Sequence, residues 1–276
     1  MRLLPDDPVE YLRRLGEAGD GPHDVASAAL MLSALDNPGR DLDPDIDHLG
    51  ELAEQSRREG RHAADAERGA QALAMLLAGK YGYDGDRLFY GDPKNADLIS
   101  VIDRRRSLPV SLGILYLHAA RAASFRASGL YSPGHFLLRV EVGRTEALID
   151  PFNGGGTVDQ ESLGVLPSVR GIRRHRSEAI RPIDDIEVLL RLGNNLKLRA
   201  TEAGDLPRAL ALAKRMLLIA PKRAELWIDL AQLHEQEGEL GAAGNAYSAC
   251  LALAQPGAPL HNEAALGLEV LRYRLN

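Results

Sequence analysis

The chain has 276 residues, of which 45% are hydrophobic and 26% are charged, proportions typical of an ordinary globular protein with one large domain or two to three small ones. The formal net charge of −6 argues against a general nucleic-acid binder, because such a protein needs a basic face. The single cysteine, Cys250, excludes a framework of intrachain disulfides, and no apolar run has the length of a membrane span or the form of a secretory signal. We therefore expect a cytoplasmic protein with neither a membrane nor a nucleic-acid partner.

The first 89 residues are predicted to form a helical region. Apolar residues recur there at spacings of three and four, as on one face of a helix. The pattern predicts four helices, over Pro8–Gly16, Asp24–Leu35, Asp45–Arg58 and Ala63–Leu77. Glycine and proline separate these segments, and a stretch rich in glycine, aspartate and aromatic residues, Tyr81–Lys94, is typical of a linker to the next region.

Residues 90–165 are predicted to form the core. A short helix over Asn95–Asp103 leads into the basic run Arg104–Arg106, which either ends that helix in solvent or binds an acidic ligand. A long apolar helix is expected to begin at Leu108-Pro109, since proline costs nothing in a first turn, and to end at Ala123. The following segment, Phe125–Gly134, is predicted to be a loop because glycine and proline punctuate it.

Two short strands follow, over His135–Val142 and Ala147–Asp150, with a turn between them. Antiparallel pairing brings His135 and Asp150 towards the same open end of this hairpin. Counting residues from a tight turn nevertheless places Asp150 nearer Arg139 than His135. A direct contact between His135 and Asp150 therefore requires a longer turn or a bulge. We predict a hydrogen bond between the imidazole and the carboxylate, which either ties the strand ends together or belongs to a functional site.

Three segments, RRRSLPVSL, SPGHFLLR and IDPFNGG, resemble the transglutaminase-like core of the bacterial SirB-type family, which joins that core to C-terminal helical repeats. The resemblance implies a papain-like site in which a cysteine begins the core helix and a histidine and an aspartate lie on successive strands. His135 and Asp150 match the histidine and the aspartate. Pro109 stands where the cysteine would be, and Ser107 replaces the family's usual glycine.

The residue at the start of the core helix decides the functional prediction. A cysteine there would gain thiolate character from the helix dipole and a neighbouring imidazole, whereas proline carries no nucleophile. Ser111 is shifted by two residues, so we favour a hydroxyl that bonds the backbone of the first turn over one that His135 activates. The sequence thus predicts a transglutaminase-like pseudoenzyme. The alternative is an amide-bond hydrolase or acyl transferase that uses Ser111, His135 and Asp150.

Three further residues near the core, Asn95, Arg104 and Tyr116, are candidate binding residues. The histidines show no metal-ligand spacing such as HExxH, and no glycine-rich loop has the spacing of a phosphate site. We therefore expect neither a metal nor a cofactor.

Residues 166–190 are predicted to form a linker, and we interpret its basic stretch Val169–Arg176 as an exposed linker or docking strip. After this linker the chain repeats itself. Gly204 and Gly238 lie 34 residues apart, and so do Ala209 and Ala243. This spacing is the tetratricopeptide period. Residues 191–276 should therefore pack as antiparallel helix pairs from Asn195 onwards, with Trp227 and Tyr247 in the buried seam, Cys250 as a small buried residue, and a groove for a peptide or protein partner. The expected fold class is a mostly helical α+β.

Overall fold

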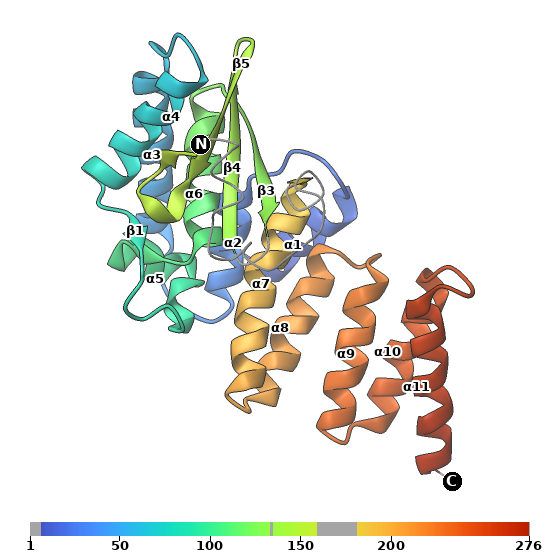
Figure 1. Cartoon of the computed structure of the whole chain (residues 1–276). Coiled ribbons are helices and arrows are strands. Elements are labelled where there is room, and N and C mark those ends of the chain that lie inside the picture. The colour runs from blue at the N-terminus through green and yellow to red at the C-terminus, as the bar shows by residue number, and fades with distance from the viewer. Residues whose placement is uncertain (1–6, 133–134, 159–180, 276) are drawn as a thin grey trace. The chain divides into compact units, whose positions relative to one another are not determined.

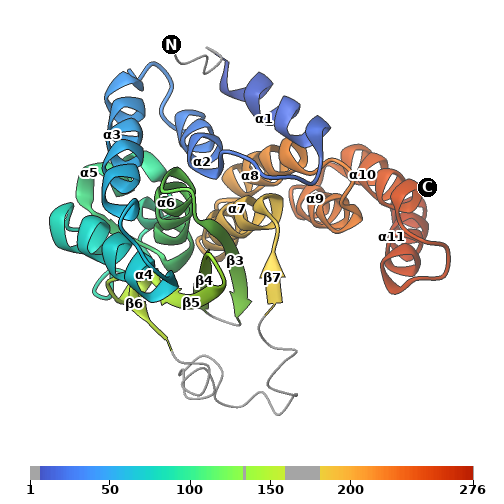
Figure 2. The ribbon, with the colours of Figure 1, turned by 90° about the horizontal axis from the view of Figure 1, so that it is seen from above.

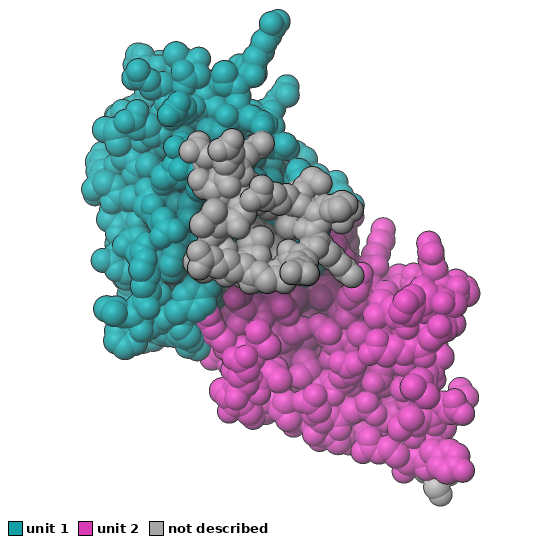
Figure 3. All heavy atoms as spheres, viewed as in Figure 1, with its two compact units in different colours: residues 1–8, 20–192 teal, residues 9–19, 193–276 magenta. Residues whose placement is uncertain are grey.

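The computed structural model of the chain describes residues 7–132, 135–158 and 181–275 (Figure 1). The chain divides into two compact units, of which unit 1 contains residues 1–8 and 20–192 and unit 2 contains residues 9–19 and 193–276 (Figure 3). Helices dominate both units and a small sheet lies in unit 1, so the predicted mostly helical α+β fold is confirmed. No helix in the described ranges is long and apolar enough to cross a membrane.

The predicted N-terminal helices are all present. Those of unit 1 are α2 (Val25–Ala34), α3 (Asp43–Gly60) and α4 (Ala66–Ala74), and α4 continues as the π-helix η1 (Met75–Lys80). Every residue of α2 is buried, and Asp24 caps its start by accepting from the backbone N–H of Ser27. A helix that is apolar on all sides belongs in the interior, and α2 packs there against α6 and α5.

The core helix α6 (Pro109–Ala122) follows α5 (Leu98–Arg104) and begins at the predicted proline. Its positions from Pro109 to Leu117 are all buried, because α2 and α3 cover it on one side and the sheet on the other (Figure 2). Gly113 leaves room for the sheet: a Cβ there would lie 2.1 Å from the ring of Phe136. The close approach of helix and sheet therefore depends on a residue without a side chain.

The sheet has five antiparallel strands in the order β6-β5-β4-β3-β7. The strands are β3 (Arg126–Ser132), β4 (His135–Val142), β5 (Thr145–Asp150), β6 (Gly156–Thr157) and β7 (Arg181–Ile183). The prediction of a loop over Phe125–Gly134 was wrong for residues 126–132, which form β3, and its last two residues lie outside the described residues. Gly129, which suggested the loop, instead lets Phe136, Val188 and Ile183 approach the strand to about 3 Å from where a Cβ would be.

Two regions predicted as linkers also contain structure. Within Tyr81–Lys94, β1 (Asp84–Gly85) pairs in parallel with β2 (Arg106–Ser107). In the second linker, β7 and the first residues of α7 lie after residue 180, whereas Val169–Arg176 falls outside the described residues. Asp185 at the start of α7 receives two bonds from Arg121 of α6, at 2.7 and 2.8 Å, which tie the two helices together.

Apart from α1, unit 2 consists of antiparallel helices. They are α7 (Asp185–Glu202) from Gly193 onwards, α8 (Leu206–Ile219), α9 (Ala224–Gln236), α10 (Leu240–Leu253) and α11 (Pro259–Leu275). Tyr247 is buried as predicted and lies against Gly267, and Cys250 is buried as well. Trp227 is only half-buried, and its indole N–H donates to the carbonyl of Pro221 at 2.8 Å.

The helix α1 (Pro8–Ala18) groups with the repeats, apart from its first residue, although it lies at the other end of the sequence. Leu12 and Leu15 are buried, and a Cβ on Gly16 would lie 2.1 Å from the carbonyl oxygen of Leu218 in α8. The compact units therefore divide the chain differently from the predicted N-terminal region of residues 1–89.

Candidate functional site

His135 and Asp150 meet at the open end of the β4–β5 hairpin. His135 is the first residue of β4, Asp150 is the last residue of β5, and the imidazole Nε2 lies 2.8 Å from the carboxylate Oδ2. The side chains are 12% and 5% exposed, so little water competes for this bond. The predicted hydrogen-bonded pair on adjacent antiparallel strands is confirmed.

The pair forms without the longer turn or bulge that the sequence suggested. Val142 pairs with Thr145 across the turn Gly143-Arg144, and the register continues regularly to Leu138 opposite Ile149. Extending that register puts Leu137 opposite Asp150, which makes His135 its diagonal neighbour on the same face. A long aromatic side chain spans such a diagonal, so the prediction of a bulge was wrong because it counted strand positions and left out the reach of the imidazole.

The carboxylate of Asp150 also holds the turn that follows it. Oδ1 accepts from the backbone N–H groups of Phe152 and Asn153 at 3.0 and 3.2 Å, and Oδ2 accepts from the Asn153 side chain at 2.6 Å. Burial opposes the charge on Asp150, but the bonds from His135 and Asn153 outweigh burial and lower its pKa. An ionised carboxylate can only accept, so Asp150 takes this bond from an N–H at Nε2 of His135 and orients the imidazole.

The start of α6 is formed by a proline and a hydroxyl that is already bonded. Pro109 occupies the first turn, and the Ser111 hydroxyl donates to the backbone carbonyl of Asn95 at 2.9 Å. The same carbonyl accepts from the N–H of Leu108 at 3.0 Å and from the Ser107 hydroxyl at 3.2 Å. Among the described residues no hydrogen bond joins Ser111 to His135, so the prediction that Ser111 bonds backbone is confirmed, but its partner is the carbonyl of Asn95 and not the backbone of the first turn.

Two of the candidate binding residues form one cluster with the loop before α5. The Asn95 side chain is fully buried, donates to the carbonyl of Phe89 at 2.7 Å and accepts from Arg104 at 3.3 Å. Arg104 also binds the buried carboxylate of Asp86 at 3.3 Å. Both side chains are thus used to fix that loop, and a ligand at this place would have to compete with these internal bonds.

The other two arginines of the basic run are engaged in the same way. Arg105 adopts a left-handed conformation with φ of 58°, ends α5, and bonds the Tyr83 hydroxyl and His48 Nε2. Arg106 donates to the carbonyl of Gly82 at 3.1 Å. The run therefore stabilises the end of α5, but Arg104 and Arg105 do so through internal bonds and not as the solvated helix end that the sequence suggested.

Tyr116, the third candidate, lies beneath the turn that Asp150 caps. It is fully buried in α6, and its hydroxyl has no hydrogen-bond partner within the described part of the chain. A Cβ on Gly155 would lie 2.2 Å from that hydroxyl, so the turn fits only a glycine there. Burial, with smaller contributions from Asp150 and Asp84, raises the pKa of Tyr116, and the phenol is neutral at physiological pH.

Sequence reasoning missed one residue at this site, Arg191 of α7. Its guanidinium donates to the backbone carbonyl of His135 and lies 5.3 Å from the ring centroid of Tyr131 and 5.6 Å from that of Phe136. Burial lowers the pKa of Arg191. This arginine holds the first residue of β4 in position, and no spacing in the sequence relates it to His135.

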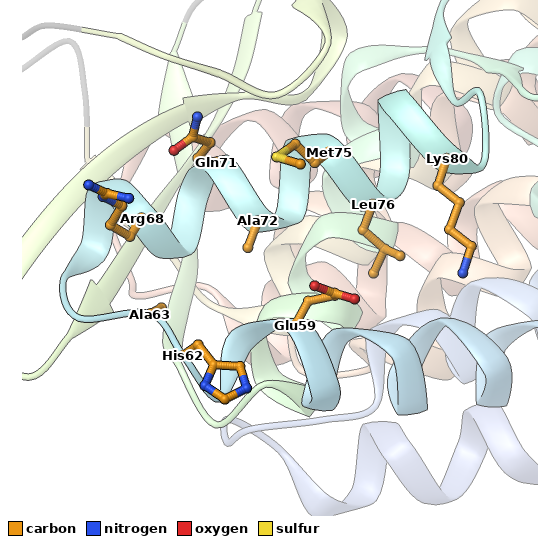
Figure 4. A pocket seen from close by; sticks show the side chains of 9 residues that line it. All are labelled: Glu59, His62, Ala63, Arg68, Gln71, Ala72, Met75, Leu76 and Lys80. Atoms are coloured by element: carbon orange, nitrogen blue, oxygen red, sulfur yellow. The ribbon is translucent and has the colours of Figure 1, made fainter.

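A groove of about 400 Å³ lies elsewhere in unit 1 (Figure 4). One wall carries Glu59 of α3, and the other carries side chains of α4 and η1, with Arg68 at one end and Lys80 at the other. Its lining includes no residue of α6, β4 or β5, so the groove is not the cavity of the His135–Asp150 pair.

Comparison with known proteins agrees with both parts of the architecture. Residues 46–194 match the family model of the transglutaminase-like superfamily, and residues 196–272 match that of the tetratricopeptide repeat. A UPF0162 protein of Xylella fastidiosa (strain 9a5c) is 29% identical in an alignment of 236 residues that covers 80% of this chain and 80% of that protein. A UPF0162 protein of Pseudomonas aeruginosa is 28% identical over 72% of this chain and 73% of its own. A crystal structure of menin aligns with 96% of this chain and 70% of its own, at 12% identity and a TM-score of 0.47.

Proposed function

Because the chain belongs to the transglutaminase-like superfamily, we propose that it has kept the superfamily's core and lost its catalysis, and that it binds a peptide or protein partner in the cytoplasm through its tetratricopeptide repeats. One observation carries the first half of this proposal: the core helix begins with Pro109, and the hydroxyl of Ser111 in its first turn is bonded to the carbonyl of Asn95. Thiol chemistry needs a sulfur at that helix start. The single cysteine, Cys250, is buried in α10 of the other unit.

The exposed surface of the repeats supports the second half. Leu198 of α7, Gln232 of α9 and Leu266 of α11 lie 34 residues apart, at one position of successive repeats. The two leucines are 53% and 61% exposed. Lys197 binds Asp229, and Gln232 donates to Glu263 at 2.9 Å, so polar pairs link α7 to α9 and α9 to α11 beside these residues. Leu198 and Leu266, with the polar Gln232 between them, are the two apolar anchors that we propose for a bound peptide.

The enzyme alternative draws on the surviving His135–Asp150 pair. An imidazole held by a carboxylate is the base that a serine nucleophile requires. Ser111 would have to leave the carbonyl of Asn95, turn towards His135 from a position two residues past the expected one, and expose a hydroxyl that is now fully buried. The pseudoenzyme proposal requires none of these changes.

The catalytic half is tested with a serine-reactive fluorophosphonate probe and with amide-hydrolysis and amine-incorporation assays on peptide mixtures. We expect no turnover and no labelling of Ser111. Covalent labelling that disappears in both Ser111→Ala and His135→Ala, together with turnover, would establish the enzyme alternative instead. The binding half is tested by panning a library of displayed random peptides on the full chain. Clones that lose binding to Leu266→Asp are expected, and a library without such clones removes the support for the repeat surface.

A further inference from the structure

Three consecutive large apolar side chains of unit 1 lie in solvent. Leu88 is 88% exposed, Phe89 is 67% exposed and Tyr90 is 45% exposed, between β1 and the start of α5. Single exposed apolar residues are common on protein surfaces and need no explanation, but a contiguous group of them marks an interaction site. These three residues contribute little to the core of unit 1, so folding alone does not account for them.

The loop that carries them is held firmly at its centre. The backbone N–H of Phe89 donates to the carboxylate of Asp86 at 2.8 Å, and its carbonyl accepts from the side chain of Asn95 at 2.7 Å. Asp86 and Asn95 are 5% and 0% exposed, and Arg104 bonds both of them. Since buried side chains fix both polar groups of Phe89, its ring is displayed in a preorganised position. A preorganised loop loses less conformational entropy when a partner binds.

The apolar surface extends from this loop to the turn after Asp150. The ring of Tyr90 meets that of Phe152 edge-on, with 5.9 Å between centroids and 76° between planes. Arg87 stacks on Phe152 at 5.1 Å and donates to its backbone carbonyl at 3.0 Å. We call Leu88, Phe89, Tyr90 and Phe152 the aromatic loop surface. It borders the His135–Asp150 pair, because the N–H of Phe152 is bonded to Asp150.

The two arginines beside the aromatic loop surface are already paired within the molecule. Arg87 lies 3.2 Å from Asp84, and Arg104 lies 3.3 Å from Asp86 and 3.5 Å from Asp92. A strongly charged ligand would have to break these pairs, whereas an uncharged apolar segment complements the surface as it stands. Aromatic residues with arginine beside them are also the composition of binding hot spots between proteins.

We propose that the aromatic loop surface is a second docking site, which binds an uncharged, apolar peptide segment of a partner protein. The site is independent of the repeat surface, since its residues come from unit 1 alone. Phe89 and Leu88 supply the apolar anchors, and Tyr90 and Phe152 extend the contact towards the His135–Asp150 pair.

The test uses the full chain and a displayed library of short random peptides. Clones rich in apolar and poor in charged residues should be selected, and Phe89→Asp and Leu88→Asp should weaken them by about tenfold or more, as expected of hot spots. Leu253→Asp is the matched control, because Leu253 is an exposed leucine, 42% accessible, on α10. All three variants replace exposed side chains and should keep the thermal unfolding curve of the parent.

The outcomes separate this site from the repeat surface. Clones whose binding depends only on Leu266 would overturn the present proposal and leave the repeat surface supported. Clones whose binding depends only on Phe89 would support the aromatic loop surface and remove the support for the repeat surface. Clones that are strongly acidic or basic would contradict the uncharged ligand. A chain that self-associates in light scattering and becomes monomeric in Phe89→Asp would assign the surface to a second copy, and that result also overturns the peptide proposal.

Discussion

The carboxylate of Asp150 accepts four hydrogen bonds, one from His135, two from backbone N–H groups and one from the side chain of Asn153. Replacement with alanine removes them all and leaves the turn after β5 without its cap. We expect Asp150→Ala to lower the free energy of unfolding by about 2–3 kcal/mol, from the loss of a cap and a charge-assisted bond. Urea unfolding followed by circular dichroism measures the change.

His135→Ala is the matched variant for this prediction. It removes only one of the four bonds and leaves the cap of the turn in place, so its effect on stability should be clearly smaller than that of Asp150→Ala. Equal stabilities of Asp150→Ala and the parent chain would show that the carboxylate does not stabilise the fold. Its remaining role would then be to orient the imidazole of His135.

His48 gives the chain a pH-dependent stability. Burial lowers its pKa from 6.5 to about 4, and the nearby Arg105 adds to the effect while Glu51 opposes it. The folded state therefore keeps His48 neutral at a pH at which the unfolded chain binds a proton. The stability that His48 contributes is complete above the unfolded pKa and is lost as the pH falls from 6.5 towards 4, by about 1 kcal/mol per pH unit.

Urea unfolding of the parent chain and of His48→Gln at a series of pH values checks this slope. The neutral glutamine should flatten the pH dependence in that window, because it takes up no proton in either state. A parent and a variant with parallel stability curves would mean that protonation of His48 is the same in the folded and unfolded chain.

At the scale of single residues, the sequence predicts which residues belong to the candidate site better than it predicts the contacts between them. His135, Asp150 and the position of Pro109 could be found because they lie in short motifs next to glycine and proline. The diagonal geometry of the pair could not be found, since it depends on the reach of an imidazole. Arg191 contacts the carbonyl of His135 from a helix far along the chain, and only the folded structure brings the two together.

At the scale of elements, the start of α6 offers a direct test of what the scaffold has kept. A sulfur in place of Pro109 would lie in the first turn, where the helix dipole and an imidazole favour the thiolate. If the His135–Asp150 pair keeps its superfamily geometry, the thiol of Pro109→Cys should react with iodoacetamide near neutral pH faster than an ordinary exposed thiol does. Mass spectrometry of the labelled peptide follows the rate and separates it from any reaction of the buried Cys250.

The control for this variant is Pro109→Cys combined with His135→Ala, which removes the imidazole and should slow the alkylation. A thiol that is inert in both proteins would mean that the scaffold has lost the geometry of the site as well as its nucleophile. An equal, rapid reaction in both would assign the activation to the helix start alone.

Element types were predictable wherever a periodic pattern met a clear boundary. Pro109 opened the predicted core helix and opens α6, and the predicted strand His135–Val142 has the same limits as β4. The strand β3 was missed because Gly129 and its polar neighbours imitate a loop. That glycine is required by the side chains of Phe136 and Val188 that approach it, which is a tertiary reason that no local pattern contains.

At the scale of the whole molecule, the period of 34 residues was enough to predict the repeats, because each unit repeats the same packing positions. The place of α1 was beyond such reasoning. Its apolar residues predict a helix with a buried face, but such a face does not determine which element covers it. Here that element is α8, some two hundred residues later in the chain.

The last prediction tests this long-range packing. Gly16 lies in α1, and a Cβ there would come within 2.1 Å of the carbonyl oxygen of Leu218, so the backbone itself must move in Gly16→Ala. Alanine favours a helix over glycine by about 1 kcal/mol, and the clash should exceed this gain, as overpacking in a tight core costs about 1–3 kcal/mol. Amide hydrogen exchange in α1 and at the end of α8 should therefore become faster, while α6 in unit 1 keeps its protection.

Gly21→Ala is the control for Gly16→Ala, because nothing lies within 4 Å of a Cβ at that position. It makes the same chemical change close by in the sequence and should leave exchange in α8 unaltered. If Gly16→Ala protects α1 better than the parent chain does, the helix propensity of alanine outweighs the contact. In that case Gly16 does not pack closely against the carbonyl of Leu218, and the grouping of α1 with the repeats loses its physical basis.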